Sequence, residues 1–330
     1  MKIDIIYSNP GGVYLSGQIV DGHVKLYVLE PTKLEAIHVR CCGNAVVSWS
    51  EGSGDDSTTY SNKETYFYTK MALLEKKPDQ RKLTLLRGVY MYPFSFQLPF
   101  DIPNSYQGNA GFVRYEVTVT VVRHWAFNKS KTFPFTVISH LDLNTLPFVN
   151  IQGVAEDEKI VRRFFSIAGR VRAAITTDRL GYVPGEDITF TAQIHNNSDT
   201  DMGPCQAALS MKVFYESTIS RTTSSYILCK QFGPAVPSGR SCLWERQKLH
   251  IPPLPPSFLH RCRLIDIEYY VSISVTPVGH GSALFVPLRI VIGTIPLQTA
   301  THVIPCKEKV FYVFYEFNAN PVQFQSASSL

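Results

Sequence analysis

The sequence predicts an all-β protein made of two tandem β-sandwich lobes that a short hinge joins. Apolar and polar side chains alternate over several stretches, as they do in half-buried strands. The chain holds 21 prolines and 20 glycines, and no stretch keeps the apolar period of about 3.6 residues that marks an amphipathic helix. A turn-and-strand motif also occurs twice, once in each half of the chain.

Composition suits a folded protein with two cores. The length of 330 residues is enough for two ordinary domains. With 45% hydrophobic and 18% charged residues, the chain is apolar enough to bury a core in each. The net charge is +5 and the basic residues are scattered. Such a surplus suits an acidic partner, the anionic inner leaflet of a membrane, or only a solvated surface. No nucleic-acid-binding module is visible, so we expect no nucleic-acid partner.

The N-terminal part predicts the first strands. Residues 1–30 contain a strand, a Gly-Gly turn and an alternating apolar run that ends at Val28. Residues 36–49, Ala-Ile-His-Val-Arg-Cys-Cys-Gly-Asn-Ala-Val-Val-Ser-Trp, predict a strand and its return. Residues 50–65 are rich in Ser, Gly, Asp and Thr, which predicts a surface loop.

Two strands in the middle of the first lobe show the alternation most clearly. The apolar side chains that share one face are Phe94, Phe96 and Leu98 in the first strand and Val113, Tyr115, Val117, Val119 and Val121 in the second. Polar side chains between them take the opposite face. We therefore expect both strands to be half buried in antiparallel sheets.

The second half repeats the first. Tyr14-x-x-Gly17-Gln18 corresponds to Tyr182-x-x-Gly185-Glu186, and a strand follows each motif. This repetition implies two similar β domains. We expect an N-terminal lobe at 1–148, a hinge at 149–156, a C-terminal lobe at 157–298 and a short C-terminal tail at 299–330.

Nothing in the chain has the spacing of a catalytic or metal site. Gly-x-Ser-x-Gly, His-Glu-x-x-His, Gly-x-Gly-x-x-Gly and the P-loop are all absent. The seven cysteines form no Cys-x-x-Cys pair, so a zinc site is not expected. We expect no enzyme activity, cofactor or metal; the alternative is an acid–base cluster that only the fold would assemble.

The ends of the chain carry no visible targeting signal. The N-terminus lacks the apolar run of a signal peptide, and no uncharged stretch approaches the roughly 18 apolar residues of a membrane span. We therefore expect a cytoplasmic protein with reduced cysteines and only peripheral membrane association.

Two stretches resemble the α-arrestins, also called arrestin domain-containing proteins. Tyr92-Pro-Phe-Ser-Phe-Gln-Leu-Pro99 and Gly111-Phe-Val-Arg-Tyr115 are similar to the N-terminal lobe of that family, and Leu288-Arg-Ile-Val-Ile-Gly-Thr-Ile-Pro-Leu297 to the end of its C-terminal lobe. The resemblance implies arrestin-type, immunoglobulin-like lobes. It also implies a non-enzymatic adaptor that binds cytosolic tails of membrane receptors and transporters. Such an adaptor is recruited to the plasma membrane and endosomes, and links cargo to endocytosis, endosomal sorting and ubiquitylation.

The tail bears on this mechanism. Long-tailed α-arrestins recruit HECT-type ubiquitin ligases through Pro-Pro-x-Tyr motifs, and none occurs here. Pro321-Val-Gln-Phe324 resembles a degraded motif, so Pro321 and Phe324 are the predicted ligase-docking remnant. Alternatively, the chain is a short-tailed regulatory member that binds cargo or other arrestins and competes with ligase-recruiting members.

Three further residues are candidate contacts. Lys2 and Lys25 lie on the first predicted strands and would bind acidic or phosphorylated cargo tails. Cys242 lies in a segment that resembles the one through which a family member bonds to thioredoxin. That member carries its cysteine one residue earlier, at the place of Ser241, and an offset of one residue turns a side chain to the other face of a strand. Cys242 is thus a redox candidate, which would make the chain a thioredoxin-binding redox or metabolic regulator, with an unreactive thiol as the alternative.

Overall fold

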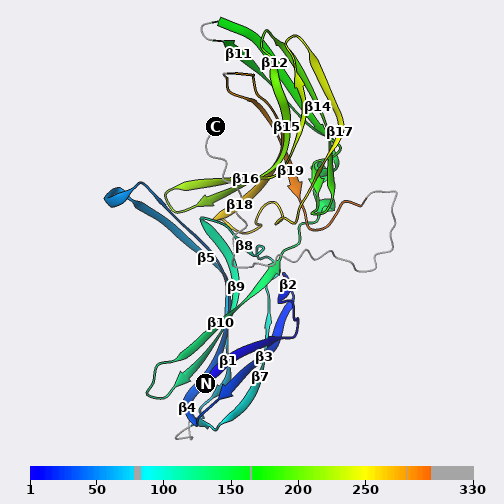
Figure 1. Cartoon of the computed structure of the whole chain (residues 1–330). Helices are drawn as coiled ribbons and strands as arrows, with labels where there is room; N and C mark the ends of the chain where they lie inside the picture. Colours follow the sequence, from blue (N-terminus) through cyan, green and yellow to red (C-terminus); the bar gives the residue numbers. More distant parts are fainter. Residues whose placement is uncertain (78–82, 164–165, 280, 299–330) are drawn as a thin grey trace. The chain divides into compact units, whose positions relative to one another are not determined.

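The computed structural model describes residues 1–77, 83–163, 166–279 and 281–298 (Figure 1). Regular structure in these ranges consists of strands and three short 3-10 helices, without an α-helix. The described part of the chain holds no helix with the length and hydropathy needed to cross a membrane. The predicted all-β fold is therefore confirmed.

The chain divides into two compact units. The first unit comprises Met1–His140 together with Tyr215–Thr222 and Leu259–Asp266. The second unit contains the other described residues from Leu141 onward. Both are built from antiparallel sheets, with one parallel pair in each.

Ten strands of the described chain lie wholly within the first unit, which also includes the ends of three later strands. The bounds of the ten strands are β1 (Lys2–Tyr7), β2 (Val13–Leu15), β3 (Ile19–Val28), β4 (Thr32–Glu51), β5 (Thr58–Glu75), β6 (Leu83–Leu85), β7 (Gly88–Gln97), β8 (Tyr106–Gln107), β9 (Gly111–Arg123) and β10 (Lys129–Ile138). One sheet has the order β1-β3-β7. The other has the order β2-β10-β9-β4-β5, with β6 beside β4 and β8 beside β9.

These two sheets bury the alternating faces that the sequence predicted. The core contains Phe94 and Phe96 of β7, Leu98 directly after it, and Val113, Tyr115, Val117, Val119 and Val121 of β9. Edge-to-face aromatic contacts join the sheets: the Tyr7 ring of β1 meets Tyr14 of β2 and Phe135 of β10. A sandwich results because each sheet has one apolar face to cover.

Two local predictions are wrong. Residues 36–49 do not turn back but belong to the single strand β4, and Gly43-Asn44 forms a β-bulge there. A Cβ on Gly43 would lie 2.4 Å from the Tyr115 ring. The glycine is therefore needed because the ring packs closely against the backbone, and not because the chain turns there.

The expected loop at 50–65 is mostly strand as well. Only a short turn containing the 3-10 helix Gly54–Asp56 separates β4 from β5, and the Ser50 and Thr59 hydroxyls bond across it at 2.9 Å.

The second unit has the same design. Its strands are β11 (Gly153–Arg163), β12 (Ser166–Thr177), β13 (Gly181–Tyr182), β14 (Asp187–Ser198), β15 (Met202–Glu216), β16 (Arg221–Val236), β17 (Ser241–His250), β18 (Ile265–Val275) and β19 (Leu284–Ile292). The sheets have the orders β11-β12-β14-β17 and β13-β19-β18-β15-β16. Phe190 of β14 and Trp244 of β17 meet edge to face with ring centroids 5.3 Å apart.

The repeated motif forms the same turn in both units. The side chain of Gln18 accepts a hydrogen bond from the Leu15 amide at 2.9 Å, and Glu186 accepts one from the Val183 amide at the same distance. The intervening glycines have φ of +81° at Gly17 and +91° at residue 185, which other residues seldom adopt. The short strand before each turn pairs in parallel, β2 with β10 and β13 with β19.

The segment around the expected hinge has some regular structure. Leu143–Thr145 and Pro147–Asn150 form 3-10 helices, and β11 begins at Gly153. The hinge at 149–156 and the lobe boundaries stay predictions. The predicted tail at 299–330 lies entirely outside the described residues.

Candidate functional site

The edge strand β1 and its neighbour β3 carry the two predicted cargo contacts. In their antiparallel register Lys2 lies opposite Tyr27, and Asp4 lies opposite Lys25. Both lysines therefore lie on the outer face of the sheet, beside the Tyr27 ring. The ammonium of Lys2 lies 5.6 Å from the ring centroid and that of Lys25 lies 5.0 Å from it. One aromatic ring thus holds two cations together by cation–π attraction.

Strand β10 adds two more lysines beside β1. The Lys131 ammonium donates to the Ile3 carbonyl at 3.2 Å and lies 3.7 Å from the Asp4 carboxylate. The Lys129 ammonium donates to the Met1 carbonyl. The sequence analysis did not single out either residue, although an i, i+2 spacing is a signal that two side chains share one face of a strand.

Within the part of the chain that the structure describes, β1 pairs with β3 alone, and no strand pairs with its other edge. Main-chain groups of alternate residues point to that edge, and at Met1 and Ile3 the carbonyls accept from lysine side chains and not from a strand. The lysine side chains are long and flexible, so they can release these carbonyls. The carbonyls can then accept hydrogen bonds from the main chain of an added peptide strand. Four lysines surround this edge and Asp4 is the carboxylate among them, so we define the β1 edge site as Lys2, Asp4, Lys25, Lys129 and Lys131.

A partly buried tyrosine hydroxyl joins β1 to the other sheet. Tyr7 donates to the Phe133 carbonyl of β10 at 3.2 Å. Burial raises the pKa of Tyr7 far above its ordinary value, so the hydroxyl keeps its proton at any physiological pH. This hydrogen bond between β1 and β10 therefore does not depend on the ionisation of Tyr7.

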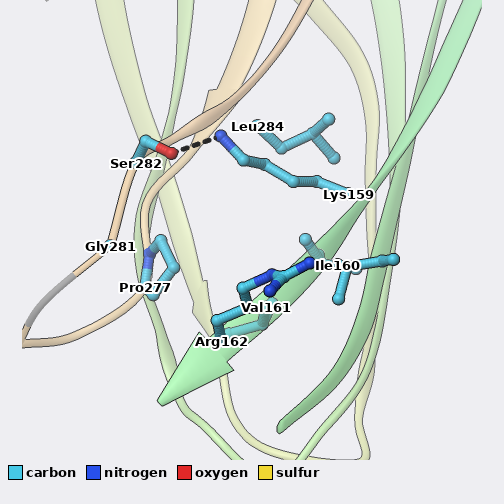
Figure 2. A pocket seen from close by; sticks show the side chains of 9 residues that line it. Lys159, Ile160, Val161, Arg162, Pro277, Gly281, Ser282 and Leu284 are labelled. Carbon is cyan, nitrogen blue, oxygen red and sulfur yellow. Dashed lines mark hydrogen bonds between the residues drawn. The ribbon is translucent and has the colours of Figure 1, made fainter. Parts of the chain in front are cut away.

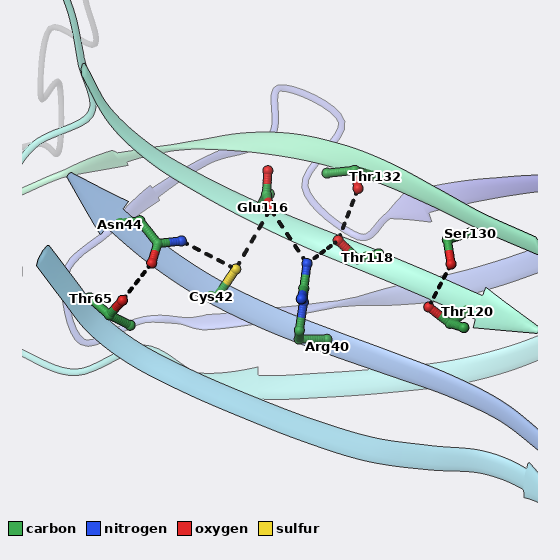
Figure 3. A network of polar contacts seen from close by, with 9 residues as sticks. All are labelled: Arg40, Cys42, Asn44, Thr65, Glu116, Thr118, Thr120, Ser130 and Thr132. Carbon is green, nitrogen blue, oxygen red and sulfur yellow. Dashed lines mark hydrogen bonds and ion pairs between the residues drawn. The ribbon is translucent and has the colours of Figure 1, made fainter. Parts of the chain in front are cut away.

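A polar network lies across the larger sheet of the first unit (Figure 3). The Arg40 guanidinium contacts Glu116 at 3.7 Å and donates to the Thr118 hydroxyl at 3.2 Å. Thr118 continues to Thr132 at 3.0 Å. These cross-strand pairs stabilise the outer face of β4, β9 and β10. Cys42 joins the network through Glu116, but burial raises the pKa of its thiol, so it is not an activated nucleophile.

Cys242 lies on β17 opposite Ile194 of β14. Its side chain is half buried, whereas the preceding Ser241 is exposed and its hydroxyl meets His195 Nδ1 at 2.8 Å. Burial raises the pKa of the Cys242 thiol. Both observations weigh against rapid disulfide exchange at this position, and the redox role stays a prediction.

The second unit contains a small pocket of about 320 Å³ between β11 and the segment leading into β19 (Figure 2). Lys159 reaches across it and donates to the Ser282 hydroxyl at 2.6 Å and the Ala283 carbonyl at 2.9 Å. Arg162 also lines the pocket, and its described lining residues include no carboxylate.

The described residues include neither the predicted ligase-docking residues nor a cluster that fits a metal ion. Pro321 and Phe324, the predicted ligase-docking remnant, lie outside the described residues. Within the described ranges, no three His, Cys, Asp or Glu side chains gather as a metal ion would require.

Comparison with known proteins agrees with this architecture. Residues 3–144 match the family model for the N-terminal domain of arrestin (or S-antigen), and residues 168–297 match the model for its C-terminal domain. Arrestin domain-containing protein 17 of Caenorhabditis elegans is 28% identical over 94% of this chain and 74% of that protein. Arrestin domain-containing protein 4 of Mus musculus is 30% identical over 86% of this chain and 69% of that protein.

A third relative, arrestin domain-containing protein 1 of Mus musculus, is 30% identical over 80% of this chain and 58% of that protein. The first family model covers most of the first β-sandwich unit, and the second model covers most of the second unit. All three relatives are arrestin domain-containing proteins. These likenesses support an adaptor role of the arrestin kind. The chain belongs to the arrestin family, among the arrestin domain-containing proteins.

Proposed function

We propose that this chain is a non-enzymatic adaptor that binds extended acidic or phosphorylated tails of membrane receptors and transporters at the β1 edge site. The observation that carries the proposal is the open edge of β1 with four lysines around it. An added peptide strand gains main-chain hydrogen bonds from the edge. Ammonium groups gain charge-assisted bonds to carboxylates or phosphates.

The proposal places the protein in the cytoplasm, recruited to the plasma membrane and endosomes by its cargo. Binding of a tail would then link that cargo to endocytosis, endosomal sorting and ubiquitylation. Membership of the arrestin family supports this placement.

Peptide titration tests cargo binding. A phosphorylated tail peptide is titrated by calorimetry into the wild-type chain, Lys2→Gln, Lys25→Gln and, as a control, Lys70→Gln, which removes an exposed lysine from β5. Each site variant should weaken binding by about two- to fivefold at low ionic strength. The control should bind like wild type. Equal affinities in all four chains would refute a role for this site.

Ligase recruitment needs its own test. We propose that the segment with Pro321 and Phe324 provides a weak contact for WW domains of HECT-type ligases. Titration of the full chain and of a 299–330 peptide against such WW domains should give binding at micromolar affinity. No binding would favour the competing function, a regulatory arrestin that binds cargo or other arrestins without bringing a ligase.

A further inference from the structure

The turn between β9 and β10 exposes two large aromatic side chains. Trp125 is 93% exposed and Phe127 is 94% exposed. They lie two residues apart in the five-residue turn that joins Arg123 to Lys129. Burial of such side chains would be strongly favourable, so their exposure points to a partner that covers them.

Hydrogen bonds and an ion pair hold the turn in a defined conformation. The Arg123 guanidinium donates to the Phe127 carbonyl at 2.7 Å, and the Asn128 side chain accepts from the Arg123 amide at 3.4 Å. His124 Nδ1 contacts the Glu35 carboxylate of β4 at 3.0 Å. Trp125 has a φ of +53°, a conformation that few residues other than glycine adopt. Strained backbone therefore presents the indole to solvent.

Neighbouring turns at the same end of the first unit add apolar surface. Arg123 pairs with Leu34, Thr32 pairs with Leu85, and Val28 pairs with Gly88. This register places the turns after β3 and β6 beside the end of β9. They carry Leu29 and Leu86, which are 67% and 64% exposed.

The positive charge of the hairpin favours an anionic lipid surface over a peptide as the partner. From Arg123 to Lys131 the hairpin has three cations, Arg123, Lys129 and Lys131, and no carboxylate. Glu35 nearby is engaged by His124. Apolar tips flanked by cations suit a bilayer surface, where tryptophan settles at headgroup depth and lysine or arginine meets anionic headgroups. A peptide partner would instead suit a groove or a strand edge.

We propose that this end of the first unit, defined as the β9–β10 tip, docks directly on an anionic lipid surface with Trp125 and Phe127 inserted among the headgroups. This contact goes beyond cargo binding, because it attaches the protein to the membrane without a protein receptor. The hairpin shares Lys129 and Lys131 with the β1 edge site, but Trp125 and Phe127 lie outside that site. Variants of the two aromatic residues therefore test the tip separately from cargo binding.

Vesicle binding with a fluorescence readout tests the proposal. The full chain is mixed with phosphatidylcholine vesicles, with and without phosphatidylserine, and a parallel set carries bromine on the lipid tails. We expect sedimentation only with phosphatidylserine, reduced by added salt. We also expect bromine to quench tryptophan emission. Trp125→Phe should still sediment but lose the quenching, because the other tryptophans, Trp49 and Trp244, lie outside the tip.

Two variants separate the tip from the rest of the surface. Trp125→Ala/Phe127→Ala should bind vesicles at least about tenfold more weakly. Ile219→Ala, which trims an apolar side chain that is 83% exposed in another turn, should bind like wild type. The proposal is overturned if no vesicle binds, if the double variant binds like wild type, or if Trp125→Phe is quenched as strongly as wild type. A protein partner for the tip would give the first of these results.

Discussion

At the N-terminal edge of the first unit, one tyrosine ring determines where two cations lie. Lys2 and Lys25 belong to different strands, and the Tyr27 ring lies within 5.6 Å of both ammonium groups. Ammonium side chains on flexible stems lose rotamer entropy when they bind a ligand. A ring that already gathers them reduces that loss, so Tyr27 is a positioning residue for the β1 edge site.

Replacement of the ring tests this role. We expect Tyr27→Leu to weaken binding of a phosphorylated tail peptide by about two- to fivefold, the equivalent of an exposed cation–π contact. Calorimetry measures the effect, and Tyr68→Leu, an exposed tyrosine on β5, is the control. Unchanged affinity in Tyr27→Leu, together with weakened affinity in Lys2→Gln, would show that the ring does not position the lysines.

Cys242 makes a second prediction at the level of single residues. Burial raises its pKa above the ordinary value of 9.0, so the folded chain holds less thiolate at pH 8 than a free cysteine does, and the rate of alkylation is lower. Cys205, whose pKa burial raises to about 11, should react more slowly still. Mass spectrometry after timed iodoacetamide treatment measures both.

The unfolded chain in urea provides the reference rate for this experiment. Reaction of Cys242 in the folded chain that is faster than in urea would contradict the raised pKa. It would also support the hypothesis that Cys242 bonds to thioredoxin.

Contact between β1 and β3 depends on a glycine. A Cβ on Gly22 would lie 2.3 Å from the Ile6 carbonyl oxygen, which is backbone and cannot swing away. Gly22→Ala should therefore displace β1 and lower the free energy of unfolding by about 1–3 kcal/mol. Urea unfolding measures this loss, and tail-peptide binding should fall with it.

Gly88 on β7 of the same sheet is the matched control. There an added Cβ meets the nearest atom at 3.6 Å, which is ordinary contact, so Gly88→Ala should be close to neutral. Equal stability of both variants would mean that β1 tolerates displacement and that its register is not fixed by close packing.

Strands were predictable from the sequence where one face is buried, and less so elsewhere. Alternation placed Val117 and Val119 in the core correctly, because a period of two separates the faces of any half-buried strand. It failed at Gly43-Asn44, since a turn and a bulge use the same residue types. The lysines of β10 were missed for another reason: their contact with β1 joins residues more than a hundred positions apart.

At the scale of the whole molecule, duplication is the most predictable feature. The paired turns at Gln18 and Glu186 make equivalent hydrogen bonds, and both family models lie on the units that contain them. Lys2 and Lys25 could be named from sequence only as basic residues on early strands. Their meeting at Tyr27 depends on the register of β1 against β3, which no single-strand pattern specifies.

The central claim is that an extended acidic tail adds to the edge of β1. Hydrogen–deuterium exchange of backbone amides, with and without a saturating phosphorylated tail peptide, tests it most directly. Since the Ile3 carbonyl points to the open edge, the amides of Ile3 and Ile5 point there too, and the peptide should slow their exchange. Binding that leaves β1 exchange unchanged, or that protects another strand instead, would contradict the account.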